Sequence, residues 1–124
     1  MTTLVGALRG VEGTSLRTVA ALESLDYEMR FVRDDLADAY DQEDLDRAYQ
    51  SMMANQVSTD DFSRAIETGD IEAQLYFFEK VVVFLFPSSR YDGVFCSFDR
   101  TDPFPVQQVI DAAEDATVGA DDGR

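Results

Sequence analysis

The stretch DIEAQLYFFEKVVVFLFPSSRYDGVFCSFD, which runs from Asp70 to Asp99, decides the fold. It contains three runs of apolar residues, separated by the short Glu79–Lys80 connection and by a longer segment that includes Pro87 and Asp92–Gly93. Proline fixes the φ angle and glycine accepts a positive φ, so both residue types favour turns. The stretch therefore predicts three consecutive antiparallel strands that form the middle and one side of a sheet.

The three predicted strands differ in how their side chains alternate. In Ile71 to Phe78 one face is fully apolar and the other is mixed. Val81 to Phe86 is apolar at every position, so both faces of that strand need cover and it belongs in the interior of the sheet. In the third strand, an inward face is formed by Val94, Cys96 and Phe98.

The residues before this stretch predict a short helix and a hairpin. Thr2 or Thr3 can cap the helix. Leu16 to Leu22 taken by itself fits a helix or a strand, whereas Tyr27 to Arg33 alternates clearly between apolar and polar residues. Because the connection between these segments is short enough for a hairpin, we predict that both are strands.

Helices are predicted in the middle and at the end of the chain. Asp41 and Asp44 form a pair typical of a capping box, and Ser58 with Asp61 predicts the start of a second, short helix. A last helix is predicted to have Pro103 in its first turn. The middle helix carries an apolar face at helical spacing, made of Leu45, Ala48, Tyr49, Met52 and Met53.

The length of 124 residues predicts one α/β domain over residues 1–116, followed by a flexible acidic tail over 117–124. A net charge of -15, with Lys80 the only lysine, argues against partners that carry a phosphate backbone and against anionic membranes. The acidic residues are spread along the chain. Such a surface resembles that of proteins from salt-accumulating halophiles, and a dedicated basic partner is the alternative explanation.

The residue types also limit the chemistry. There is no histidine, which excludes Ser-His and Cys-His nucleophilic arrangements and histidine-containing zinc sites. The single cysteine, Cys96, cannot form an internal disulfide and lies at an inward strand position, which indicates a buried thiol. The acidic residues between Asp34 and Asp46 lack the spacing of an EF-hand and indicate a solvated helix face. We therefore predict no catalytic residue, no cofactor and no metal, and, without an apolar amino-terminal signal, a cytoplasmic location.

The predicted order is helix, strand, strand, one or two helices, three strands and a helix, which is an α+β fold with a five-stranded antiparallel sheet and helices on both faces. This order resembles the roadblock/LC7 domain, which is profilin-like, and the PAS domain. The phrase Phe31 to Leu36, followed by an acidic helix and a valine-rich hairpin, is similar to a group of small uncharacterised haloarchaeal proteins. The resemblance implies the sheet order 2-1-5-4-3, with Ile71 to Phe78 at an edge.

The resemblance also implies two kinds of function. The roadblock domain implies homodimers joined along that edge and the middle helix, and binding to small GTPases or their regulators. We therefore expect a non-enzymatic cytoplasmic interaction or regulatory module that homodimerises and binds a protein partner in signalling. The alternative is a PAS-like sensor that binds a small apolar ligand between sheet and helices. Residues expected at the dimer or partner interface are Tyr76, Phe78, Gln74, Glu72, Tyr49 and Met53.

Overall fold

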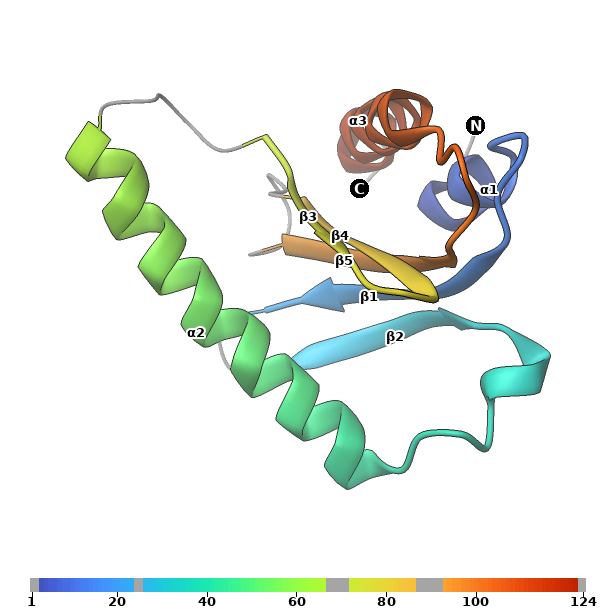
Figure 1. Cartoon of the computed structure of the whole chain (residues 1–124), viewed down its shortest axis with the longest axis horizontal. Coiled ribbons are helices and arrows are strands. Elements are labelled where there is room, and N and C mark those ends of the chain that lie inside the picture. The colour runs from blue at the N-terminus through green and yellow to red at the C-terminus, as the bar shows by residue number, and fades with distance from the viewer. Residues whose placement is uncertain (1–2, 24–25, 67–71, 87–92, 123–124) are drawn as a thin grey trace.

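The computed structural model describes residues 3–23, 26–66, 72–86 and 93–122, and its elements follow the predicted α+β order (Figure 1). The sheet order is β2-β1-β5-β4-β3, and every neighbouring pair is antiparallel. This confirms the predicted topology and places β3 at an edge. The elements are α1 (Leu4–Arg9), β1 (Leu16–Leu22), β2 (Tyr27–Val32), a 3₁₀ turn (Asp34–Leu36), α2 (Gln42–Ile66), β3 (Gln74–Phe77), β4 (Val81–Phe86), β5 (Gly93–Asp99) and α3 (Val106–Asp122).

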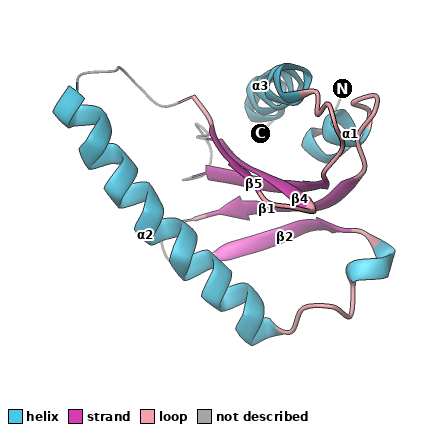
Figure 2. Ribbon diagram, viewed as in Figure 1, coloured by secondary structure: helices cyan, strands magenta, loops and turns pink. Residues whose placement is uncertain are grey.

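The larger hydrophobic core lies between the sheet and the helices α1 and α3, which cover the same face (Figure 2). Phe84 of β4 is fully buried there, and its ring centroid lies 5.6–5.9 Å from those of Phe86, Phe98 and Phe104. The inward residues of β5 belong to this core, and so does Val109 of α3. The inward face predicted for Val94, Cys96 and Phe98 is therefore confirmed.

The opposite face of the sheet is covered by α2, and less completely. A smaller core there contains Ala20, Leu22 and Leu85, with Tyr49 and Met52 of α2 packed against it. The β4 residues that point to this face were predicted to be fully covered, yet those nearer its start, Val81 and Val83, are only half-buried. The reason is that α2 runs diagonally past the sheet (Figure 1).

Two of the predicted helix boundaries are wrong. The predicted restart at Ser58 is absent, because α2 is continuous from Gln42 to Ile66 and contains neither proline nor glycine. Serine and aspartate favour helix caps, but they are tolerated inside a helix when the flanking residues continue it. The last helix begins at Val106 instead of Pro103, since a second proline at position 105 disfavours helical geometry for the residue before it.

Other boundaries agree or extend the prediction. Thr3 caps α1 by accepting a hydrogen bond from the Gly6 N–H at 3.0 Å. Asp41 and Asp44 form the predicted capping box, with N–H to carboxylate distances of 2.8 and 3.2 Å. The helix α3 continues through Asp122, into the segment predicted as an acidic tail. The start of the predicted third strand, at Ile71, lies outside the described residues.

Candidate functional site

The edge strand β3 is the first candidate site. It pairs with β4 on one side, and its other side is a free edge among the described residues. At the end of β3, Phe77 and Phe78 are 50% and 53% exposed; Tyr40 is the only other exposed large hydrophobic residue among those whose side chains the structure describes, which leaves out 55–66 and 117–122. Clustered exposed aromatic side chains beside an open edge are typical of a pairing surface.

The hydrogen-bonding pattern of the hairpin shows which backbone groups of β3 point outward. The Phe78 N–H donates to the Val81 carbonyl at 2.8 Å, which makes these residues a hydrogen-bonded pair. Pairs alternate along an antiparallel ladder, and the register places Tyr76 opposite Val83. Backbone groups of Tyr76 therefore point to β4, whereas those of Leu75 and Phe77 point away from the sheet.

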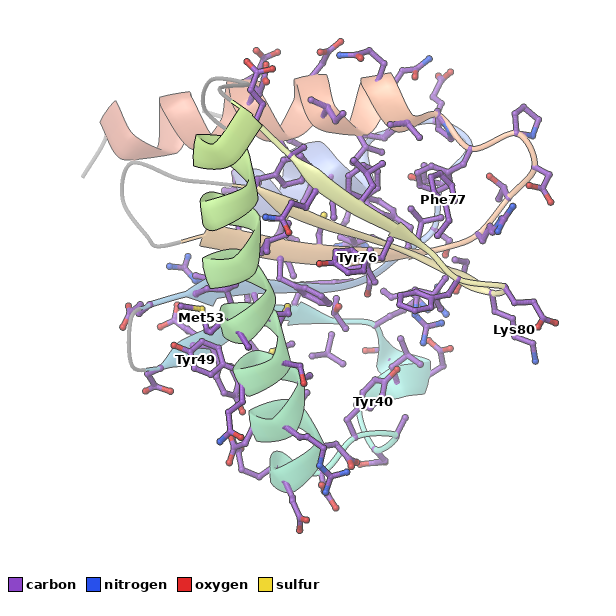
Figure 3. The ribbon with its side chains drawn as sticks, turned by 60° about the vertical axis from the view of Figure 1, so that its left-hand side comes forward. Tyr40, Tyr49, Met53, Tyr76, Phe77 and Lys80 are labelled. Atoms are coloured by element: carbon purple, nitrogen blue, oxygen red, sulfur yellow. The ribbon has the colours of Figure 1, made fainter. Side chains whose placement is uncertain are left out.

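Four of the six predicted interface residues gather on one side of β3. Glu72 is exposed just before the strand, and Gln74 and Tyr76 are half-buried on the face that α2 covers. The Tyr76 ring stacks on Phe78, with centroids 6.4 Å apart and planes at 18°. Lys80 lies at the tip of the same hairpin (Figure 3). The period of two residues thus placed these side chains together as expected.

The other two predicted residues, Tyr49 and Met53, are not brought to this strand. Figure 3 shows them on one side of α2 and Tyr76 on the other. The Tyr49 ring packs on Tyr27 with centroids 5.2 Å apart, and its hydroxyl donates to the Glu23 carbonyl. Tyr49 therefore fastens α2 to the β1–β2 hairpin.

A pocket of about 280 Å³ between α2 and the sheet is the second candidate site. Its floor comes from β1, β2, β4 and β5, and its roof comes from the first half of α2. It opens to solvent between α2 and the 3₁₀ turn, where Tyr40, Asp44 and Ala48 are exposed. Its lining is mainly apolar, including Ala20, Leu22, Met29, Met52, Val83 and Phe95.

Two hydroxyl groups form a polar spot on the floor of this pocket. Thr18 of β1 and Ser97 of β5 are cross-strand neighbours, and their hydroxyl oxygens lie 2.6 Å apart. Both residues are more than nine-tenths buried and line the pocket. The sequence carried one signal for them, since each is a hydroxyl residue among mostly apolar strand residues, but the pairing of β1 with β5 was needed to bring them together.

An ion cluster closes one end of the pocket. Asp99 accepts hydrogen bonds from Arg17 at 2.9 Å and from Arg33 at 2.7 Å, and Arg33 also donates to Asp35 at 2.6 Å. Arg17 donates a further hydrogen bond to the Tyr40 hydroxyl at 3.1 Å. The hydrogen bond from Arg33 holds the pKa of Asp99 below its usual range. The pair of Arg33 with Asp35 is local in sequence, whereas Arg33 and Asp99 are 66 positions apart, so no signal in the sequence indicated their contact.

Two further titratable groups have shifted pKa values. Cys96 is fully buried, as predicted, and burial raises the pKa of its thiol. Burial and a hydrogen bond to Asp46 raise the pKa of Tyr27 to about 12. Over the described ranges, no three histidine, cysteine, aspartate or glutamate side chains converge as a metal site. The helices in those ranges include none that is both long and apolar enough to cross a bilayer.

Comparison with known proteins gives a family. Residues 2–118 match the family described as a domain of unknown function, DUF7522. No curated protein matches the chain, and no solved structure does. Since the match extends over most of the 124 residues, the chain belongs to the DUF7522 family.

Proposed function

We propose that the protein is a non-enzymatic interaction module that forms a homodimer through β3. The observation that carries the proposal is the edge of this strand, to which no described strand is paired, with Phe77 and Phe78 about half exposed beside it. An exposed edge is a template for a further strand, because its N–H and C=O groups lack partners within the sheet. Pairing of two β3 strands would join the two sheets into one.

The outward backbone groups favour one register for this pairing. An antiparallel arrangement with Tyr76 on the two-fold axis sets Leu75 of each copy opposite Phe77 of the other. Both residues carry outward N–H and C=O groups, so all of these groups from the two strands are used. If the register of the two strands is shifted by two residues in either direction, some of these outward groups face residues outside the four-residue strand β3.

The charges near β3 support the same register. With Tyr76 on the axis, Glu72 of each copy faces Lys80 of the other, and both residues are exposed. Lys80 is the only lysine in a chain with a net charge of -15. Two copies of such a chain repel each other, so opposite charges at the contact favour the pairing and discriminate against other registers.

A dimer of this kind acts by presenting a surface to a protein partner, which we place in cytoplasmic signalling. The resemblance of the element order to that of the roadblock domain supports this role, in which the partner binds outside the paired strands. The acidic composition supports a halophilic origin, in which the charge serves solubility in concentrated salt.

A cysteine at the proposed axis tests the register directly. In Tyr76→Cys the two thiols face each other at a non-hydrogen-bonded position, where Cα atoms lie about 4.5 Å apart, a separation that a disulfide spans. We expect mild oxidation to give a covalent dimer. The matched control is Gln74→Cys, on the same face of the strand but off the axis, which should remain uncrosslinked. Native Cys96 is fully buried and does not interfere.

Two further variants test the energetics of the pairing. Replacing Tyr76 and Phe78 together by Asp should convert the dimer to a monomer of unchanged circular dichroism. Lys80→Glu should weaken the dimer, and combining it with Glu72→Lys should restore it. Light scattering that finds a monomer for the unmodified protein at millimolar concentration, or efficient crosslinking of Gln74→Cys with none of Tyr76→Cys, would refute the proposal.

A further inference from the structure

The pocket between α2 and the sheet is independent of the β3 edge. We propose that it is a binding site for a small, neutral, mostly apolar molecule that carries one hydrogen-bond acceptor, such as an aryl or alkyl ketone. The acceptor is bound by the buried Thr18 and Ser97 hydroxyls, and the hydrocarbon part lies against α2. This goes beyond dimerisation, because it uses different residues and a different kind of partner.

The size of the pocket selects a small molecule. A volume of about 280 Å³ lies just below the range typical of ligand pockets. Liquid water takes up about 30 Å³ per molecule, so the space corresponds to roughly nine waters or a ligand of about ten non-hydrogen atoms.

The apolar lining of the pocket favours a ligand with a hydrocarbon or aromatic part. Side chains from four strands and α2 contribute hydrocarbon or aromatic surface, and Val83, Phe95 and Met52 are only half-buried, because no side chain that the structure describes fills the space above them. Covering such surface is favourable, by about 25 cal/mol for each Å² removed from water. Methionine side chains such as Met29 and Met52 also adapt to ligands of different outline.

The two hydroxyl groups on the pocket floor favour a ligand with one hydrogen-bond acceptor. The Thr18 and Ser97 hydroxyls share one hydrogen bond, in which one O–H donates to the other oxygen. The second O–H of the pair has no acceptor among the described protein groups, and it lies at the floor of the pocket. A buried donor without a partner is costly, and a ligand carbonyl at this position would satisfy it.

The charges select a neutral ligand. Arg17, the cationic residue of the lining, already donates to Asp99 and Tyr40, and the neighbouring Arg33 is balanced by Asp99 and Asp35. An anion would therefore enter an apolar space with no unbalanced positive charge beside it. A cation would be attracted only to Asp44, which is exposed at the mouth and solvated. Moving either ion into the apolar pocket is unfavourable.

Three probes of similar size test the site in the full chain: propiophenone, propylbenzene and 3-phenylpropanoate. We expect propiophenone to bind saturably in NMR titrations, with shift changes at Ala20, Met29 and Phe95. We expect 3-phenylpropanoate to bind at least about tenfold more weakly, because its charge is not compensated. Ala48→Phe should weaken propiophenone at least tenfold by filling the pocket from α2. Ala54→Phe, at another exposed position of the same helix outside the lining, should leave propiophenone binding unchanged within a factor of about two.

The double variant Thr18→Val with Ser97→Ala tests the hydroxyl pair. Replacing both partners leaves no unsatisfied group, so the fold should persist. The preference for propiophenone over propylbenzene should fall by about two- to tenfold. An unchanged preference, no saturable binding of propiophenone, or equal binding by Ala48→Phe would overturn the inference. So would pocket resonances that respond to protein concentration and to none of the probes, since a second copy would then occupy the pocket.

Discussion

The substitution Asp99→Asn isolates the ion cluster that joins β5, β1 and the segment after β2. Asp99 accepts from Arg17 at 2.9 Å and from Arg33 at 2.7 and 3.4 Å. In the variant the side chain keeps one acceptor oxygen, and its new amide group faces a guanidinium. Two arginine side chains are then left close together with only Asp35 to balance them.

The magnitude follows from burial. A hydrogen bond to a charged group contributes about 1.5–3 kcal/mol when well buried. The Asp99 side chain is 40% exposed, and the Arg17 and Arg33 side chains are 17% and 26% exposed, so solvent screens the interaction. We therefore expect the free energy of unfolding to fall by about 1–2 kcal/mol at pH 7 in total.

The pH dependence gives the cluster a distinct signature. The pKa of Asp99 is lower in the folded protein than in the unfolded chain, because Arg33 and Arg17 donate hydrogen bonds to it. Its contribution is therefore fully present above the unfolded pKa of about 3.9 and is lost as the pH falls through the folded value. The stability difference between the native protein and Asp99→Asn should be constant from pH 7 to 5 and should shrink below pH 4.

Urea unfolding followed by circular dichroism at pH 7, 5, 4 and 3 measures this difference. Asp102→Asn is the matched control, since its carboxylate is 84% exposed and lies 3.5 Å from Arg100. It removes the same charge and should change stability by no more than about 0.5 kcal/mol. An Asp99→Asn protein as stable as the control at pH 7, or a difference that persists undiminished at pH 3, would contradict the role given to the cluster.

The remaining predictions concern the core and the charge. Phe84→Ala should lower the free energy of unfolding by about 3–5 kcal/mol, because it leaves a cavity among three aromatic rings, and urea titration with unchanged stability would contradict this. Cys96 should react with a thiol reagent only at the rate of unfolding; fast labelling of the folded protein would show that β5 is not buried as described. The midpoint of thermal unfolding should rise as KCl is raised from 0.1 to 1 M, where the screening length falls from about 10 to 3 Å, and a lower midpoint would show that repulsion among the acids does not limit stability.

The sequence alone was sufficient for features that depend on local pattern. The continuous apolar run of Val81 to Phe86 predicted an interior strand, and the Asp41 and Asp44 pair predicted a helix start; both are confirmed. The exposed Phe78 was correctly placed on the mixed face of β3. These predictions need only periodicity and local hydrogen bonding, which neighbouring residues determine.

Features that depend on the distance between elements could not be predicted from the sequence. The spacing of Ala48 and Met52 shows which face of α2 is apolar, but it does not show how far that face stands from the sheet, so the pocket was not predicted as a site with named residues. Asp99 and Arg33 meet only because β5 is inserted beside β1. The start of α3 was misplaced because the prediction overlooked Pro105, which disfavours helical geometry at Phe104; the packing of Phe104 against the core is a tertiary contact.

The position of β5 has a consequence for how the chain folds. Its partner across the middle of the sheet is β1, and the Thr18 and Ser97 pair joins residues separated by 79 positions. The hairpins β1–β2 and β3–β4 form from local contacts, yet β5 must insert between them before either hydrophobic face is continuous. Long-range pairing of this kind slows folding, because the loop that it closes is entropically costly. During synthesis, the edges of β1 and β4 therefore remain unpaired until β5 has left the ribosome.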